Sequence, residues 1–202
     1  PEVVIPAPGG FRLVPGASGV ARMANLPAAD RNSLLRQLES LERMADVILI
    51  DTGAGIGQNV LGFAAAAGAV LVTVTPEPTS ITDAYALIKS LHSRCPDIRV
   101  ELLVNMTSGE AEARDVHERI ARVAETFLGR EVAFAGSVPF DSTVREAVRS
   151  RYPVTLHRPR SPASRAVRGL ADHYIRTFLE DEIAGRPRPT GFFARLADWM
   201  GI

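Results

Sequence analysis

Residues 47–57 read VILIDTGAGIG, a short apolar run that ends in Asp51 and continues into a glycine-rich turn. A β-branched run bounded by turn residues predicts a strand over Val47–Ile50 that is buried on both faces, as in a parallel sheet. Ligands of open α/β sheets bind outside the carboxyl ends of the strands, which is where Asp51 falls. A carboxylate and a glycine-rich turn at that place suit a hydrated Mg²⁺ and a nucleotide phosphate. A purely structural role, in which Asp51 caps a helix that begins near Gln58, stays open.

The composition limits the class of protein. With 202 residues, 46% of them hydrophobic, the chain can build one full α/β domain. Lys plus Arg and Asp plus Glu balance at 23 each, so no excess of positive charge favours nucleic acid. Cys95 is the only cysteine in the sequence, which excludes an internal disulfide and favours a reducing compartment. The four histidines do not have metal-ligand spacing.

Strands and amphipathic helices alternate along the rest of the chain. Four further strands are predicted, at Phe11–Val14, Ala69–Thr75, Arg99–Asn105 and Val132–Val138. Helices are predicted from about Asn32 to Met44, over Asn59–Ala67, from Ser80 to about Leu91, between Ser108 and Gly129, over Val144–Arg149 and over Ala163–Leu179. Ser80 and Ser108 are the predicted N-caps of their helices. The alternation predicts an α/β fold with a doubly wound, mostly parallel sheet.

Polar and turn residues follow the predicted strands and should line one rim of the sheet. They are Asp51, the loop from Thr75 to Thr79, Asn105, and the segment Pro139-Phe140-Asp141. The amide of Asn105 offers both a donor and an acceptor, which suits the edge of an adenine. An ordinary strand-end turn explains Asn105 equally well.

Several segments together resemble a known family. They are DVILIDTGAGIGQNV (46–60), VTPEPTSITDAYALIKSL (74–91), LLVN (102–105) and VPFDSTVREAVRSRYPV (138–154), with FRLVPGASG (11–19) and SPASRAVRGLA (161–171) in the same order. This series is similar to the MinD/ParA-type ATPases of the P-loop superfamily, and more narrowly to the flagellar-number regulators of the FlhG/FleN branch. The likeness covers nearly all residues from about 10 to 180, and the TPEPTSITDAYALIK segment is its most specific part.

The resemblance implies an ATP and Mg²⁺ site. Asp51 matches the catalytic Walker B aspartate, which organises Mg²⁺ through water. The residues Thr52, Gly53, Ala54 and Gly55 match the second switch loop, whose backbone senses the γ-phosphate. Asn105 matches the asparagine that reads adenine, and Pro139 and Asp141 match the loop that closes over the base.

The chain also departs from the family. Family members carry a glycine-rich phosphate loop with two lysines and a first switch aspartate, whereas here no Gly-Lys-Ser/Thr occurs and Lys89 is the only lysine in the sequence. A site without these groups cannot cradle β- and γ-phosphates. Because the chain opens on Pro1, we expect it to be the carboxy-terminal two-thirds of such an ATPase, inactive alone. A natural relative that never hydrolyses ATP is the alternative.

The end of the chain is predicted to form a separate element. We expect an ATPase domain over 1–183, a linker over 184–190 and an amphipathic helix over 191–202. One apolar stripe of that helix carries Phe192, Phe193, Leu196, Trp199 and Met200. Such a helix can lie in the headgroup boundary of a membrane, as the targeting helices of the family do, or dock on the protein's own surface.

The resemblance implies an ATP-dependent spatial switch that regulates flagellar number or placement. It implies a nucleotide-dependent homodimer, a flagellar SRP-type GTPase and basal-body switch proteins as partners, and a cytoplasmic protein reversibly bound at the inner face of the cell membrane. A non-catalytic pseudo-ATPase scaffold is one alternative. A ParA-like DNA-partitioning ATPase is another, which the balanced charge and the aromatic tail disfavour.

Overall fold

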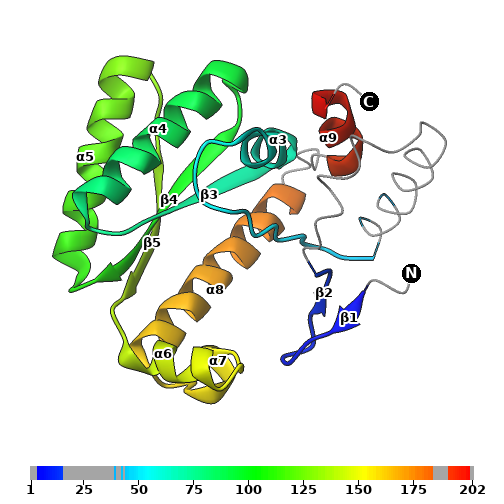
Figure 1. Cartoon of the computed structure of the whole chain (residues 1–202), viewed down its shortest axis with the longest axis vertical. Helices are drawn as coiled ribbons and strands as arrows, with labels where there is room; N and C mark the ends of the chain where they lie inside the picture. The colour runs from blue at the N-terminus through cyan, green and yellow to red at the C-terminus, as the bar shows by residue number, and fades with distance from the viewer. Residues whose placement is uncertain (1–3, 16–38, 40–41, 43, 184–190, 201–202) are drawn as a thin grey trace. The chain divides into compact units, whose positions relative to one another are not determined.

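The computed structural model describes residues 4–15, 39, 42, 44–183 and 191–200. Contacts divide the chain into two compact units, 1–68 with 189–202 and 69–188. Figure 1 labels the helices and strands of both. Most of the helix predicted from Asn32 to Met44, and the whole linker 184–190, lie outside the described residues. The domain boundaries predicted from the sequence stay a prediction.

The larger unit is built on a parallel sheet of three strands. They are β3 (Ala69–Val74), β4 (Arg99–Thr107) and β5 (Ala133–Pro139), in the order β3-β4-β5. The register pairs Ala69 with Arg99 and Val74 with Val104, so β3 and β4 run side by side over the full length of β3. All three strands appear at the positions predicted from their apolar runs, because β-branched side chains pack well on a pleated, buried surface.

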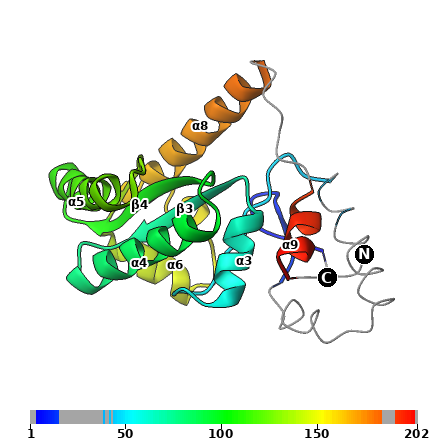
Figure 2. The same ribbon diagram turned by 90° about the horizontal axis from the view of Figure 1, so that it is seen from above.

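Helices cover both faces of this sheet. The long ones are α4 (Pro78–Arg94), α5 (Glu110–Leu128) and α8 (Pro162–Ile183), with the short α6 (Ser142–Arg149) and α7 (Val154–His157) between β5 and α8. Figure 2 shows α4 and α8 on opposite sides of the sheet. Val100, Leu102 and Val104 are at most 3% exposed and alternate along β4 with residues of the other face. This arrangement confirms the predicted α/β class with a parallel sheet.

A buried carboxylate ties α8 to β4. Glu101 is 2% exposed, and its Oε2 accepts a hydrogen bond of 2.7 Å from the hydroxyl of Tyr174 on α8. Its Oε1 lies 2.5 Å from Nη2 of Arg99. Burial, followed by the neighbouring carboxylate, raises the pKa of Tyr174, so the phenol stays a donor to Glu101.

The described residues of the smaller unit include a short hairpin and the helices α3 and α9. Strands β1 (Ile5–Pro6) and β2 (Arg12–Leu13) pair antiparallel, so the predicted strand Phe11–Val14 shrinks to its two central residues. Helix α3 (Gln58–Ala66) follows the glycine-rich turn, and helix α9 (Phe192–Met200) lies within the predicted tail helix. The two helices pack against each other.

The predicted strand Val47–Ile50 does not form. The segment carries no regular secondary structure, and Leu49 is 89% exposed. A parallel strand is stable only with hydrogen-bonded neighbours, and the described strands of the parallel sheet pair with one another and not with this segment. The prediction of a buried strand over Val47–Ile50 is therefore wrong, because an apolar run does not by itself specify a pairing partner.

Both predicted serine N-caps are wrong. Helix α4 begins at Pro78 after Glu77, because proline is favoured in the first turn, and Ser80 Oγ instead accepts a hydrogen bond of 3.0 Å from the backbone N–H of Thr75. Helix α5 has Gly109 in the N-cap position. Its predicted end is confirmed, since Gly129 adopts the left-handed conformation with φ 58°.

Among the described residues, no helix is long and apolar enough to cross a bilayer.

Candidate functional site

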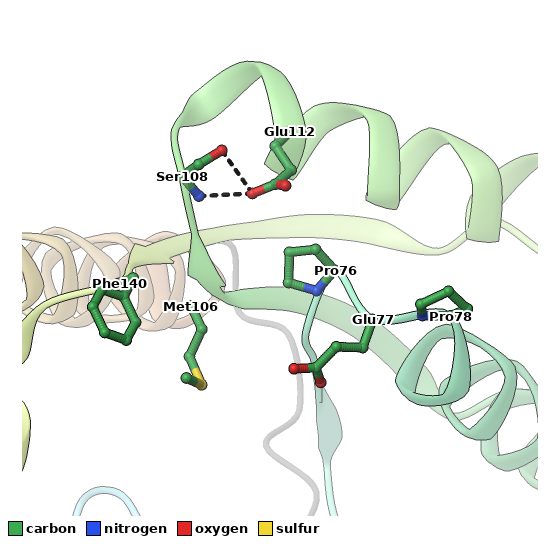
Figure 3. A pocket seen from close by; sticks show the side chains of 7 residues that line it. All are labelled: Pro76, Glu77, Pro78, Met106, Ser108, Glu112 and Phe140. Atoms are coloured by element: carbon green, nitrogen blue, oxygen red, sulfur yellow. Dashed lines mark hydrogen bonds between the residues drawn. The ribbon is translucent and has the colours of Figure 1, made fainter.

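The carboxyl ends of β3, β4 and β5 meet at one rim, where an open hollow of about 560 Å³ lies (Figure 3). Because the strands are parallel, residues that follow them are brought to the same edge. Register pairs join Asn105 to Val138 and Thr107 to Pro139, and the N–H of Phe140 donates to the carbonyl of Thr107 over 2.9 Å. The hollow is lined by Pro76, Glu77, Pro78, Met106, Ser108, Glu112 and Phe140.

The loop after β3 forms one wall of the hollow. Its path is fixed by two contacts of Thr75, whose N–H donates to Ser80 Oγ over 3.0 Å and whose Oγ1 donates to Glu77 Oε2 over 2.5 Å. Pro76 and Pro78 restrict the backbone further, because each ring fixes its own φ. The wall is therefore rigid and largely apolar.

The end of β4 places an amide and a strained residue at the rim. Asn105 Oδ1 accepts a hydrogen bond of 2.9 Å from the N–H of Met106, which orients the amide and leaves its NH₂ group as the donor for a ligand. Met106 has φ 59°, a left-handed conformation that a side chain with a Cβ rarely adopts. The ladder to β5 shifts register here. Backbone strain of this kind collects at binding sites.

A serine and a glutamate close the far side of the hollow. Glu112 Oε2 accepts hydrogen bonds from Ser108, 2.7 Å from its N–H and 2.9 Å from its hydroxyl. These bonds lower the pKa of Glu112, so the carboxylate stays charged beside the hollow. Ser108 was predicted to cap α5 by accepting a hydrogen bond from a backbone N–H of the first turn. Instead, it donates to the side chain of Glu112 in that turn.

The segment after β5 brings an aromatic ring and a structural carboxylate. Phe140 is 52% exposed and faces the hollow, with the guanidinium carbon of Arg145 5.3 Å from its ring centre. Asp141 Oδ1 accepts hydrogen bonds from the N–H and the hydroxyl of Thr143, at 2.9 and 2.6 Å, and Oδ2 accepts from the N–H of Ala163 at 3.1 Å. The bond from the Thr143 side chain contributes most to lowering the pKa of Asp141 to about 2.

The side chain of Asp141 is therefore the N-cap of α6 and a link to the start of α8. A contact between the 139–141 segment and a base would have to come from the backbone or from the ring of Phe140. The nucleotide role of Pro139 and Asp141 stays a prediction.

The residues from Asp51 to Gly55 lie in the other unit and are exposed. Gly55 has φ 99°, which favours glycine, whereas a Cβ at Gly53 would meet no atom within 4 Å. The N-cap position of α3 is Gly57, and no side chain caps it. Capping of α3 by Asp51 is thus excluded as the explanation of that carboxylate, and its Walker B role stays a prediction.

The described residues hold no group of three or more His, Cys, Asp or Glu side chains arranged for a metal. Sequence reasoning missed Met106, Glu112 and the ring of Phe140 as lining residues. The i, i+4 spacing of Ser108 and Glu112 could have indicated their hydrogen bond, whereas nothing in the sequence indicates the left-handed turn at Met106.

The predicted membrane helix α9 is docked on α3 of the same unit. Leu196 is buried at 3% exposure, and the ring of Phe192 stacks on Phe63 with centroids 6.4 Å apart. Trp199 lies against Gly62, where a Cβ would meet its ring at 2.6 Å. Phe193 is half-buried, and the side chain of Met200 lies outside the described ones. Docking on the protein's own surface, one of the two expected outcomes, is the arrangement found here.

Two polar contacts secure the ends of these helices. Glu42 accepts hydrogen bonds from the N–H groups of Gly191 and Phe193, at 3.1 and 2.9 Å, and so caps the amino end of α9. Arg195 donates from Nε and Nη2 to the carbonyl of Ala66, at 3.0 and 2.7 Å, and so caps the carboxyl end of α3.

Comparisons with known proteins bear on identity. No family model matches the chain. The chain is 39% identical over 170 residues to the antiactivator FleN of Pseudomonas aeruginosa, an overlap of 84% of this chain and 61% of FleN. It is 30% identical over 203 residues to the flagellum site-determining protein YlxH of Helicobacter pylori, which covers 99% of this chain and 68% of YlxH. The chain thus spans about three fifths of FleN and two thirds of YlxH.

The fold agrees with these relatives. It is similar to that of the MinD cell division protein from Aquifex aeolicus, with a TM-score of 0.62 and 20% identity, over 94% of this chain and 72% of that one. The sequence identity to FleN and YlxH then decides the branch. The chain belongs to the MinD/ParA-type ATPase family, among the flagellar regulators related to FleN and YlxH.

Proposed function

We propose that the chain is part of an ATP-dependent, membrane-associating switch that controls flagellar number or placement. The observation that carries the proposal is the hollow at the carboxyl rim of three parallel strands, which is lined by Pro76, Met106 and Phe140. Asn105 does not line it but directly precedes Met106 near the end of β4. Apolar walls with one oriented amide donor suit the flat face and polar edge of an adenine.

In this proposal Asp51 would hold Mg²⁺ through water, and the chemistry supplied by the ion would be neutralisation of phosphate charge. The exposed backbone from Thr52 to Gly55 donates to the γ-phosphate. The 202 residues contain no Gly-Lys-Ser/Thr, so ATP turnover needs a phosphate-binding group from outside them. We therefore expect this chain to bind adenine nucleotides weakly and to hydrolyse none.

The proposal extends to dimerisation, partners and place. The whole protein would form a nucleotide-dependent homodimer and act on a flagellar SRP-type GTPase and basal-body switch proteins. It would be cytoplasmic and reversibly bound at the inner membrane face. The docked α9 supports a cycle in which the apolar stripe is stored on α3 in one state and meets lipid in another. A helix of nine residues buries little apolar area, so two copies are needed for stable attachment.

The test of the nucleotide site is titration with a fluorescent ATP analogue and its guanine counterpart. We expect the adenine analogue to bind better, and Asn105→Ala to weaken its binding about tenfold, because one hydrogen bond to a buried base edge contributes about 1 to 2 kcal/mol. The matched control is Asn59→Ala, an exposed asparagine on α3. Equal affinity for both bases, unchanged by Asn105→Ala, would favour the non-catalytic scaffold.

A further inference from the structure

The segment from Asp141 to Arg168 carries an unbalanced charge. It contains seven arginines and two carboxylates, a local net charge of +5 in a chain whose formal net charge is zero. Asp141 accepts hydrogen bonds from backbone N–H groups, and Glu146 Oε2 lies 3.5 Å from Nη2 of Arg158. Within the described part of the chain, the other six arginines of this segment have no carboxylate within ion-pair distance. Their charge is therefore open to an anionic partner.

Four of these arginines surround the turn between α7 and α8, and we call Arg158, Arg160, Arg165 and Arg168 the arginine face. Figure 1 shows α7 and the first turns of α8 together, with α6 beside them. All four side chains are exposed. Their density follows from the short α7 and the tight turn, which bring the end of one helix against the start of the next.

Backbone carbonyls hold two of these guanidinium groups in place. Arg165 Nη1 donates to the carbonyl of Arg160 over 2.7 Å, and Arg168 Nη2 donates to the carbonyl of Pro159. A carbonyl does not neutralise the charge, and a guanidinium has five N–H donors, so most of them stay available. The groups are therefore positioned before a ligand arrives, which lowers the entropy lost on binding. The start of α8 adds no site of its own, because Asp141 and Ser161 already accept from its N–H groups.

Large side chains with apolar surface are exposed in the same segment. Tyr152, between α6 and α7, is 45% exposed, and Leu156 on α7 is 43% exposed. Arginine and tyrosine both combine an apolar body with a polar end, a combination suited to the boundary between lipid headgroups and acyl chains. The segment therefore presents cationic and apolar side chains on the same exposed stretch.

We propose that the arginine face, with Tyr152 and Leu156, binds the phosphate groups of an anionic lipid bilayer. This inference rests on the proposed membrane association and adds a second contact that is separate in sequence from α9. Stable attachment by a weak apolar anchor generally needs a second, basic signal, and the short α9 is a weak anchor. A bilayer engages one face of a protein, so a chain with no net charge can still bind it locally.

Duplex DNA is the other polyanion that a basic face could bind. Its affinity comes from neutralised phosphates and would leave Leu156 without a role. An acidic protein segment would pair with the arginines, but nothing in the structure indicates its shape. The exposed leucine and tyrosine therefore favour the bilayer.

The test is flotation of the full 202-residue chain with vesicles of equimolar phosphatidylglycerol and phosphatidylcholine, against vesicles of phosphatidylcholine alone. We expect binding only to the anionic vesicles. The double variant Arg160→Gln/Arg168→Gln should weaken it about tenfold or more, because each basic residue at an anionic surface contributes about a factor of five. Arg160→Gln alone should weaken binding about fivefold, since among the described contacts Arg160 takes part in a hydrogen bond only through its backbone carbonyl.

The matched control is Arg114→Gln/Arg119→Gln on α5, which removes the same charge from side chains that are 70% and 57% exposed. We expect less than a twofold effect from it. If both double variants lose binding equally, attraction depends on net charge and the inference is overturned. It is also overturned if the arginine-face variants bind vesicles normally, or if they lose binding to random duplex DNA while no form binds vesicles.

A tail variant, Trp199→Ser, separates this inference from the proposed function. If Trp199→Ser abolishes vesicle binding and the arginine-face variants do not change it, the proposed role of α9 stands and the arginine face is excluded. If the arginine-face variants lose binding and Trp199→Ser keeps it, the inference stands without α9. If the unmodified chain binds neither vesicle, the inference about the arginine face fails, and the proposed nucleotide site is judged separately by the nucleotide titration.

Discussion

The two compact units of the chain are held together in different ways. The larger unit has a core of apolar side chains on paired strands and their helices, with Ile88 and Leu102 at 0% exposure and Ile120 at 1%. In the described part of the smaller unit, one helix pair carries the packing, in which Trp199 fits against a glycine and two charged side chains cap the helix ends. Many packing contacts stabilise the larger unit, whereas the described packing of the smaller unit depends on few. Single substitutions should therefore act locally and strongly in the smaller unit.

The largest expected effect comes from Gly62→Ala. The new Cβ would lie 2.6 Å from the ring of Trp199, and overpacking of this kind costs about 1 to 3 kcal/mol. Alanine also favours the helix by up to about 1 kcal/mol, so α3 should persist while α9 is displaced. Trp199 is the sole tryptophan, so its emission should shift to the red and become easier to quench. Gly169→Ala on α8, where a Cβ meets no atom within 4 Å, is the control. An unchanged emission spectrum would show that α9 does not depend on this fit.

A smaller effect is expected from Tyr174→Phe in the larger unit. The change leaves Glu101 Oε2, in a side chain 2% exposed, without its phenol donor, and an unsatisfied buried acceptor costs about 1 to 3 kcal/mol. Arg99 still contacts Oε1 of Glu101, so we expect the loss of unfolding free energy to fall at the lower end of this range. Urea unfolding followed by circular dichroism measures it. Tyr152→Phe, an exposed tyrosine, should change the free energy of unfolding little, and equal losses from both variants would contradict this account.

The smallest expected effect is a pH dependence that Asp141 contributes. Its pKa is lowered to about 2 in the folded chain from 3.8, so folding favours the carboxylate. The stabilisation is complete above about pH 4 and is lost as the pH falls toward 2. Asp141→Asn should flatten the fall of the unfolding free energy over that range, whereas Asp83→Asn, exposed on α4, should leave it unchanged. If the unfolding free energy of Asp141→Asn falls with pH in parallel to that of the unmodified chain, Asp141 does not contribute to the pH dependence.

The larger unit was more predictable from sequence than the smaller one. Its strands and helices depend on apolar periodicity and on stops such as Gly129, which are local signals. The run Val47–Ile50 has the same local pattern as Ala69–Val74, yet only the second has a paired neighbour in β4. Pattern indicates that a segment can be a strand, and pairing decides whether it is one.

In the candidate site too, features with a local sequence signal could be predicted and features that depend on tertiary contacts could not. Asn105 and Pro139 lie at strand ends on the rim, as predicted, because strand ends can be recognised in the sequence, but neither lines the hollow and their role in binding stays a prediction. The left-handed turn at Met106 and the contact of Glu42 with α9 could not be found, because they depend on a tertiary approach. Proline at position 78 was a local signal for the start of α4 that the predicted Ser80 cap overrode.

The exchange of caps between α3 and α9 has a consequence for how the tail would leave. Helix α3 has no basic residue in its last turn, and α9 has no acidic residue in its first. Arg195 supplies the missing charge to α3, and Glu42 supplies it to α9. Undocking of the whole of α9 would uncover two helix ends and a tryptophan together. We therefore expect the tail to behave as a two-position element, docked or free, whose populations change sharply with small changes in free energy.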